Sequence, residues 1–195
     1  MRVALGFKAH SGWAALVALG ESGGTYALVD RRRVELVEHR WASAPFHAAE
    51  ELPAPEAERL VRNSVDEGRR TAVRELREAI ARTRSAGHTP VACAVLMPAP
   101  MPPWSVEQIR AVHVRMHKAE GVMFPDALAR AVEACGMKLV AIPAKELPAC
   151  ATATLKEPPA VTSDRIALLG TAVGAPWGAD QKSAALAAMI ALSQA

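Results

Sequence analysis

Two histidines and a glutamate at helical spacing, His113, His117 and Glu120, are the residues of this sequence best suited to chemistry. At about 100° per residue they fall at about 0°, 40° and −20° around a helix, so they share one face. Two imidazoles one turn apart suit zinc or a similar divalent metal, and Glu120 adds an oxygen ligand. His47 and Glu50, in the stretch PFHAAE, could supply ligands from outside the helix. A buried hydrogen-bonding set and an ordinary polar face are the alternatives.

The turn His10-Ser11-Gly12-Trp13 places an imidazole and a hydroxyl close to Lys8. A serine beside a histidine and a lysine can act as an activated nucleophile. Adjacent residues of a tight turn seldom point at one another, however, and no GxSxG elbow is present. The pattern therefore favours a hydrogen-bonded turn that closes a first hairpin, with Lys8 and His10 as candidate catalytic side chains.

A basic stretch that begins at Arg31 and ends at Arg33 is followed by Arg40, and Tyr26 and Trp41 flank it. Basic groups can follow a phosphate backbone while aromatic rings stack on bases, so Arg31, Arg33 and Arg40 are candidate nucleic-acid contacts. Because side chains alternate along a strand, only every second arginine of this stretch shares a face. The competing interpretation is a charged edge strand that discourages aggregation between sheets.

The chain has 195 residues, of which 51% are hydrophobic and 22% charged. These values predict one domain, residues 1–195, with a sizeable core, and exclude a disordered tail. The net charge of +3 is too small to argue by itself for nucleic acid. Three widely spaced cysteines exclude a disulfide framework and any CxxC motif. The longest uncharged stretch, residues 89–106, holds five prolines, so we expect no membrane span and a cytoplasmic location.

Hydrophobic patterning predicts a mixed α/β fold in which three meandering strands precede alternating helices and strands. Glycine-containing turns separate the first three strands, and a long amphipathic helix follows them. The predicted elements are strands Val3–Phe7, Trp13–Leu19 and Tyr26–Val37, helix Glu56–Ser85, strand Val91–Met97, helices Val106–Glu120 and Asp126–Cys135, strand Lys138–Ile142, a loop Pro148–Val161, a helix from Ser163 or Asp164 to about Gly174, and helix Gln181–Leu192.

This order, β-β-β-α-β-α-β-α, resembles the RNase H-like fold, and the chain looks most like its RuvC-like resolvase branch. Four segments carry the resemblance over nearly the whole chain. They are RVALGFKAHSGWAALVAL at the first two strands, VACAVLMPAP and KLVAIPAKEL at the fourth and fifth, and ADQKSAALAAMIAL at the last helix.

Nucleases of this family hold two divalent cations with carboxylates at the ends of the first and fourth strands and at the start of the last helix. The resemblance assigns these places to Lys8, to Leu96 or Met97, and to the neighbourhood of Asp180. Hard cations need several converging oxygen ligands, so one carboxylate would not support two-metal phosphoryl transfer. We expect Lys8 to put a fixed positive charge where a cation would lie, with Asp180 neutralising it. The alternative is that Lys8 points into solvent.

Three functions remain open from the sequence. The favoured one is a non-catalytic pseudo-nuclease domain that binds nucleic acid or a protein partner, because it explains a complete scaffold without its acids. The second is a metal-dependent hydrolase that uses the histidine–glutamate face with Lys8 or His10 nearby. The third is a nuclease with relocated carboxylates, drawn from Asp180, Glu120 and Glu50. A homo-oligomer is compatible with the hydrophobic composition, although nothing in the sequence locates a self-pairing surface.

Overall fold

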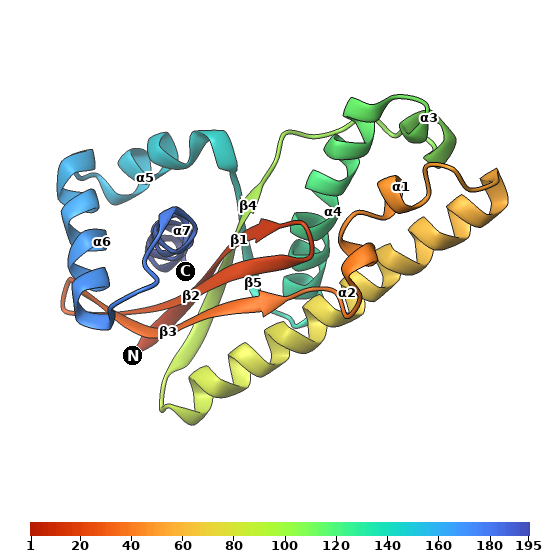
Figure 1. Cartoon of the computed structure of the whole chain (residues 1–195). Coiled ribbons are helices and arrows are strands. Elements are labelled where there is room, and N and C mark those ends of the chain that lie inside the picture. Colours follow the sequence, from red (N-terminus) through yellow and green to blue (C-terminus); the bar gives the residue numbers. More distant parts are fainter.

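The computed structural model describes all 195 residues and contains one five-stranded sheet with helices on both faces (Figure 1). The strand order is β3-β2-β1-β4-β5, in which β1, β2 and β3 pair antiparallel and β4 pairs parallel with both β1 and β5. This topology confirms the predicted α/β fold class. The strands are β1 (Arg2–His10), β2 (Trp13–Ser22), β3 (Thr25–Glu35), β4 (Thr89–Met97) and β5 (Lys138–Pro143).

Helices α2 and α4 cover one face of the sheet, and α7 lies on the other face with α5 and α6 beside it (Figure 1). The short helices α1 and α3 lie near the start of α4. The helices are α1 (Pro45–Ala48), α2 (Ala54–Ser85), α3 (Val106–Arg110), α4 (His113–Ala134), α5 (Leu147–Leu155), α6 (Pro159–Val173) and α7 (Ala179–Gln194), with 3-10 turns at Arg40–Ser43 and Ala144–Glu146.

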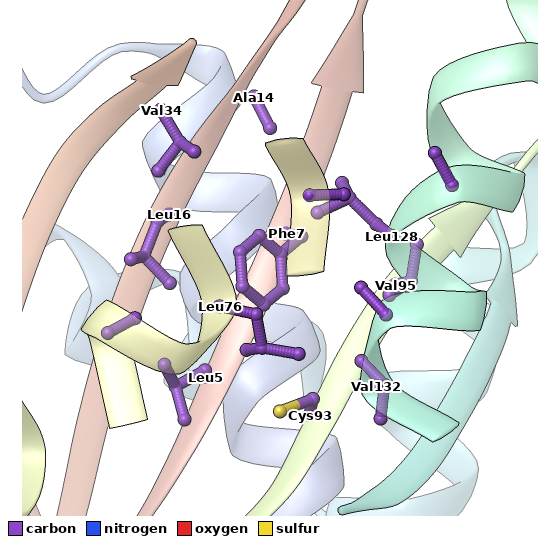
Figure 2. Close-up of a cluster of buried hydrophobic side chains, with 14 of the residues drawn as sticks. Leu5, Phe7, Ala14, Leu16, Val34, Leu76, Cys93, Val95, Leu128 and Val132 are labelled. Carbon is purple, nitrogen blue, oxygen red and sulfur yellow. The ribbon is translucent and has the colours of Figure 1, made fainter. Parts of the chain in front are cut away.

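The core between the sheet and helices α2 and α4 is built from alternate residues of the strands. Leu5 and Phe7 of β1 point into it and are almost fully buried. Figure 2 shows Phe7 surrounded by Leu76 of α2, Leu128 of α4 and Val95 of β4. Continuous apolar runs on the central strands, which are buried on both faces, and a single apolar face on α2 are the patterns from which the sequence predicted these elements.

The opposite core, against α7, depends on a close approach between two backbones. Ala4 of β1 packs in it, and an ideal Cβ at Gly6 would lie only 1.9 Å from the Ala184 carbonyl oxygen. Helix α7 therefore reaches the centre of the sheet because residue 6 has no side chain. Lys8 and His10 follow Ala4 and Gly6 in the alternation of β1, so their side chains emerge on this α7 face.

The helices between Val106 and Cys135 are divided at other places than predicted. The predicted helix Val106–Glu120 is interrupted at Ala111 and Val112, which separate α3 from α4. The second difference is at Pro125. The sequence predicted separate helices before and after this proline, whereas α4 is continuous from His113 to Ala134 and contains it. Proline removes one backbone hydrogen bond, here the one to the Gly121 carbonyl. Buried side chains on both sides of it, Phe124 and Leu128 among them, hold the helix against the sheet. Tertiary packing outweighs the local defect.

The predicted loop 148–161 was also largely wrong, because α5 and the first turn of α6 lie within it. Pro148 and Pro159 suggested irregular backbone. In the structure both stand in the first turn of a helix, where the missing N–H has no partner to lose. By contrast, the predicted cap at Ser105 is confirmed, since its side chain accepts from the Gln108 backbone N–H at 3.1 Å.

Candidate functional site

The end of β1 and the start of α7 bring two predicted site residues together. His10 Nε2 lies 2.8 Å from Asp180 Oδ1, and the two side chains are 36% and 32% exposed. The expected pairing of Lys8 with Asp180 is absent, since no carboxylate lies within 4.0 Å of the Lys8 ammonium. His10 is two residues further along the same face of β1, and its imidazole takes the carboxylate instead.

Trp13 is held between side chains of the two strands that flank β2. The His10 ring stacks on it with centroids 4.4 Å apart and planes at 11°. From the β3 side, the Arg33 guanidinium carbon lies 3.9 Å from the Trp13 ring centroid, and Glu35 pairs with Arg33. His10 is therefore positioned by two contacts, a stacked ring and the Asp180 carboxylate.

The turn between β1 and β2 serves the hairpin, as favoured from the sequence. Ladder pairing runs up to His10 and Trp13, and Gly12 adopts a φ of +82° between them. The Gly12 carbonyl accepts a hydrogen bond from the Leu36 N–H at 2.8 Å. Ser11 forms no hydrogen bond with His10, whose Nε2 is engaged elsewhere. The geometry of an activated serine is thus not assembled.

The three candidate arginines have different surroundings. Arg31 donates to the carbonyls of Gly174 at 2.8 Å and Pro176 at 2.6 Å, so it holds the segment that leads into α7. Arg33 and Arg40 instead line a hollow of about 470 Å³ beside the first hairpin, which we call the hairpin hollow. No carboxylate lies within 4.0 Å of the Arg40 guanidinium. The hairpin hollow is also lined by Ser11, Gly12, Trp13, Glu35, Val37, Glu38, His39 and Ser43.

A second cluster lies where α1 meets the start of α4. His47 of α1 and His113 and His117 of α4 place one ring nitrogen each within 4.8 Å of the others. Their ring centroids are 4.6 to 5.1 Å apart, and His113 Nε2 lies 3.0 Å from His117 Nε2. His113 and His117 are exposed, so the cluster is open to solvent. We call these three side chains the histidine triad.

Glu120 lies behind the histidine triad and not within it. Its side chain is only 5% exposed, and its Oε2 accepts from His47 Nδ1 at 2.8 Å. The other oxygen, Oε1, accepts from the backbone N–H groups of Phe46 at 3.0 Å and His47 at 3.2 Å. The group of potential metal ligands therefore differs from the predicted one: its third member is His47, and Glu120 bonds to His47. Helical spacing shows that residues share a face, but it does not show how deeply each side chain is buried.

The carboxylates considered for a relocated nuclease centre do not gather. Asp180 bonds to His10, Glu120 is enclosed by α1, and the histidine triad is the chain's one group of three or more potential metal-ligating side chains. Strand β1 ends at His10 and β4 at Met97, and Asp180 is the second residue of α7. No helix of the protein combines the length and hydropathy that a membrane crossing requires.

No family model and no curated protein sequence matches this chain. Among solved structures, it is similar to Thermus thermophilus RuvC in complex with a Holliday junction substrate, at 15% sequence identity and a TM-score of 0.48, over 97% of this chain and 92% of that one. A second Thermus thermophilus RuvC structure is similar at the same identity and TM-score, over 96% of this chain and 92% of that one.

Proposed function

We propose that this chain is an RNase H-like domain that binds nucleic acid at the hairpin end of its sheet without cutting it through a pair of divalent cations. The observation that carries the proposal is the hairpin hollow, which is lined by Arg33, Arg40 and Trp13, with the Arg33 guanidinium over the Trp13 ring. A protein partner in place of nucleic acid is an outcome that the test below separates.

The charges around the hairpin hollow favour an anionic ligand. Arg40 has no carboxylate within 4.0 Å, and of the two glutamates in the lining, Glu38 pairs with Arg74 of α2 at 3.4 Å. The Arg33 guanidinium carbon lies 3.9 Å from the Trp13 ring centroid, while Glu35 pairs with the Arg33 Nε. An arginine fixed by stacking loses less conformational freedom when it contacts a phosphate, because its rotamer is already set.

The same region is poorly suited to two-cation cleavage. Magnesium and calcium ions take oxygen ligands, and two-metal phosphoryl transfer needs several of them converging on a pair of sites. Here Asp180 already bonds to His10, and the two glutamates that line the hairpin hollow, Glu35 and Glu38, pair with Arg33 and Arg74. Lys8 on the same face adds a positive charge that would repel a cation.

Binding can be measured by fluorescence anisotropy with labelled duplex and branched DNA over a salt series. We expect the affinity to fall as salt rises, and Arg40→Ala to weaken binding and to reduce the slope of log K against log salt by about 0.9, the value for one phosphate contact. Arg77→Ala is the matched control, since Arg77 is exposed on α2 and does not line the hairpin hollow. Equal effects of the two variants, or no binding at about 50 mM salt, would refute the proposal.

Two further results would replace the proposed function with another one. Salt-independent capture of one protein, without nucleic-acid affinity, would move the function to a protein partner. Magnesium- or manganese-dependent cleavage that is lost in Asp180→Asn would show that the sheet edge is a working nuclease centre after all.

A metal-dependent hydrolase is a second candidate, and the histidine triad is the specific observation that favours it. Three imidazoles that leave one coordination position free are the ligand set of zinc sites that activate water. The structure does not place Lys8 or His10 there, because both emerge on the α7 face while α4 covers the other. Hydrolysis of chromogenic phosphoesters that requires added zinc and is lost in His113→Ala would support this candidate.

A further inference from the structure

The histidine triad is assembled from two parts of the chain that are 66 residues apart at their nearest members, His47 and His113. His113 and His117 stand one turn apart at the start of α4, and α1 brings His47 to the same place. The three imidazoles contact one another through ring edges and faces, with centroid separations of 4.6 to 5.1 Å. Such convergence of one residue type is not required by the core, since all three rings lie at the surface or partly so.

The contacts of His47 show which of its two ring nitrogens is free to bind a metal. Its Nδ1 lies 2.8 Å from Glu120 Oε2. An ionised carboxylate only accepts hydrogen bonds, so Nδ1 carries the proton, and in the neutral ring Nε2 then presents a lone pair. That Nε2 atom is buried and has no hydrogen-bond partner. A buried acceptor without a hydrogen-bond partner is energetically costly. The His47 ring that carries this free acceptor lies next to the rings of His113 and His117.

Glu120 gives His47 the surroundings of a metal ligand. A ligating histidine commonly donates its other ring N–H to a carboxylate, which fixes the tautomer and the ring orientation and raises its basicity. Glu120 does this while it also accepts from the backbone N–H groups of Phe46 and His47, so α1 and α4 are tied together by one buried side chain. The position of His47 is therefore set before any ligand arrives.

The donor set selects the class of cation. Magnesium and calcium prefer oxygen ligands, whereas neutral imidazoles suit zinc, copper, nickel and cobalt. Nitrogens bound to zinc at about 2.0–2.1 Å in tetrahedral geometry lie about 3.3–3.4 Å apart. The His113–His117 separation of 3.0 Å and the 4.8 Å limit for the whole triad bracket this spacing. Small rotations of the exposed His113 and His117 rings would bring the three nitrogens to the separations found around a tetrahedral zinc ion.

We infer that His47, His113 and His117 form a binding site for a late first-row divalent metal, zinc first, with Glu120 as a positioning residue behind His47. The three imidazoles occupy three tetrahedral positions, and the fourth faces solvent and takes water. This site is independent of the nucleic-acid proposal, because it lies on the α4 side of the sheet and shares no residue with the hairpin hollow.

The test is metal binding by the purified full chain after removal of metal with a chelator. Zinc is titrated in competition with a chromophoric chelator, and cobalt(II) is used as a spectroscopic probe of coordination geometry. We expect one equivalent of zinc per chain, tetrahedral cobalt absorption bands, and a rise of several degrees in Tm on zinc addition. His113→Ala, which changes an exposed side chain, should abolish all three.

Glu120→Gln separates a positioning role from ligation. The amide cannot replace the carboxylate fully, so zinc affinity should fall about 10- to 100-fold while the stoichiometry and the tetrahedral cobalt spectrum remain. If this variant fails to fold, His117→Ala provides the second measurement, because His117 is exposed and its loss should remove binding without unfolding the chain.

His39→Ala is the matched control, since His39 is an exposed histidine of the hairpin hollow. It should bind zinc as the unmodified protein does. Zinc stoichiometry near zero at micromolar free zinc would overturn the inference and leave the triad as a hydrogen-bonded histidine set. Equal loss of binding in His39→Ala and His113→Ala would also overturn it, because the metal would then be held by scattered surface histidines.

Discussion

Replacement of Gly6 by alanine is a direct test of how α7 is placed against the sheet. The added Cβ would lie 1.9 Å from the Ala184 carbonyl oxygen and 2.9 Å from the Ala188 nitrogen. Ordinary contact begins near 3.4 Å, so the first separation is short by 3.4 − 1.9 = 1.5 Å. Both partners are backbone atoms of α7, and the Cβ itself stands on the central strand, so no side chain can rotate away. Helix α7 must move.

Overpacking of a core costs about 1–3 kcal/mol when neighbouring side chains can adjust. Because backbone must move here, we expect Gly6→Ala to lower the free energy of unfolding by about 3 kcal/mol or more. In a domain of this size about 1 kcal/mol corresponds to about 2–4 °C, so Tm should fall by about 6–12 °C. A shift of α7 would also carry Asp180 away from His10, which NMR of the His10 ring would detect.

The assay is thermal and urea unfolding of the full chain, with Gly121→Ala as control. Gly121 is an exposed helical residue of α4, and a Cβ added there would have no atom within 4 Å. Alanine at this position should therefore stabilise the protein by up to about 1 kcal/mol. A Tm of Gly6→Ala within about 2 °C of the unmodified protein, with the His10 signal unchanged, would refute the packing of α7 described above.

Three further features can be tested, each with its own assay. They are the packing of Trp177, the burial of Cys93 and the hydrogen bonds of Arg31. Gly170→Ala puts a Cβ 2.2 Å from the Trp177 ring, so the indole should leave its site and lose its bond to the Ile166 carbonyl, seen as a red-shifted fluorescence spectrum. Burial raises the pKa of the Cys93 thiol to about 12, so iodoacetamide should label it at neutral pH only after unfolding. Because the unfolded thiol ionises near pH 9 and the native one does not, Cys93 should lower stability by about 1.4 kcal/mol per pH unit from pH 9 towards 12, a slope absent in Cys93→Ala. Arg31→Ala releases the carbonyls of residues 174–176, and limited proteolysis should then cut this segment faster.

The fold could be predicted because its central strands are continuous apolar runs and its long helix α2 has one apolar face. Phe7 and its neighbours on β1 alternate between the two cores, and Leu76 marks one face of α2. Prolines led to the wrong boundaries, because the local effect of a proline depends on its position. Pro125 is tolerated within α4 by packing, and Pro148 stands in the first turn of α5, where a loop was expected.

The candidate site could be predicted only in part. Helical spacing placed His113 and His117 on one face, and His47 was predicted as a candidate ligand from outside the helix. The depth of Glu120 could not be inferred from spacing, since it depends on how α1 folds over α4. Likewise, the sequence suggested Lys8 as the partner of Asp180, whereas in the structure His10, two residues further along β1, bonds to this carboxylate.

The histidine triad and the His10–Asp180 pair lie on opposite sides of one sheet, and the alternation of β1 explains why. Phe7 points towards α4, whose first turns carry two of the three histidines, while Lys8 and His10 point towards α7 and Asp180. A single active centre that combines the triad with His10 would require β1 to slip by one residue, which would exchange the side chains that face the two cores. Metal binding and nucleic-acid binding should therefore respond independently to mutation. His113→Ala should leave the salt dependence of DNA binding unchanged, and Arg40→Ala should leave zinc affinity unchanged. Coupling between the two would mean that the sheet transmits a change between its faces.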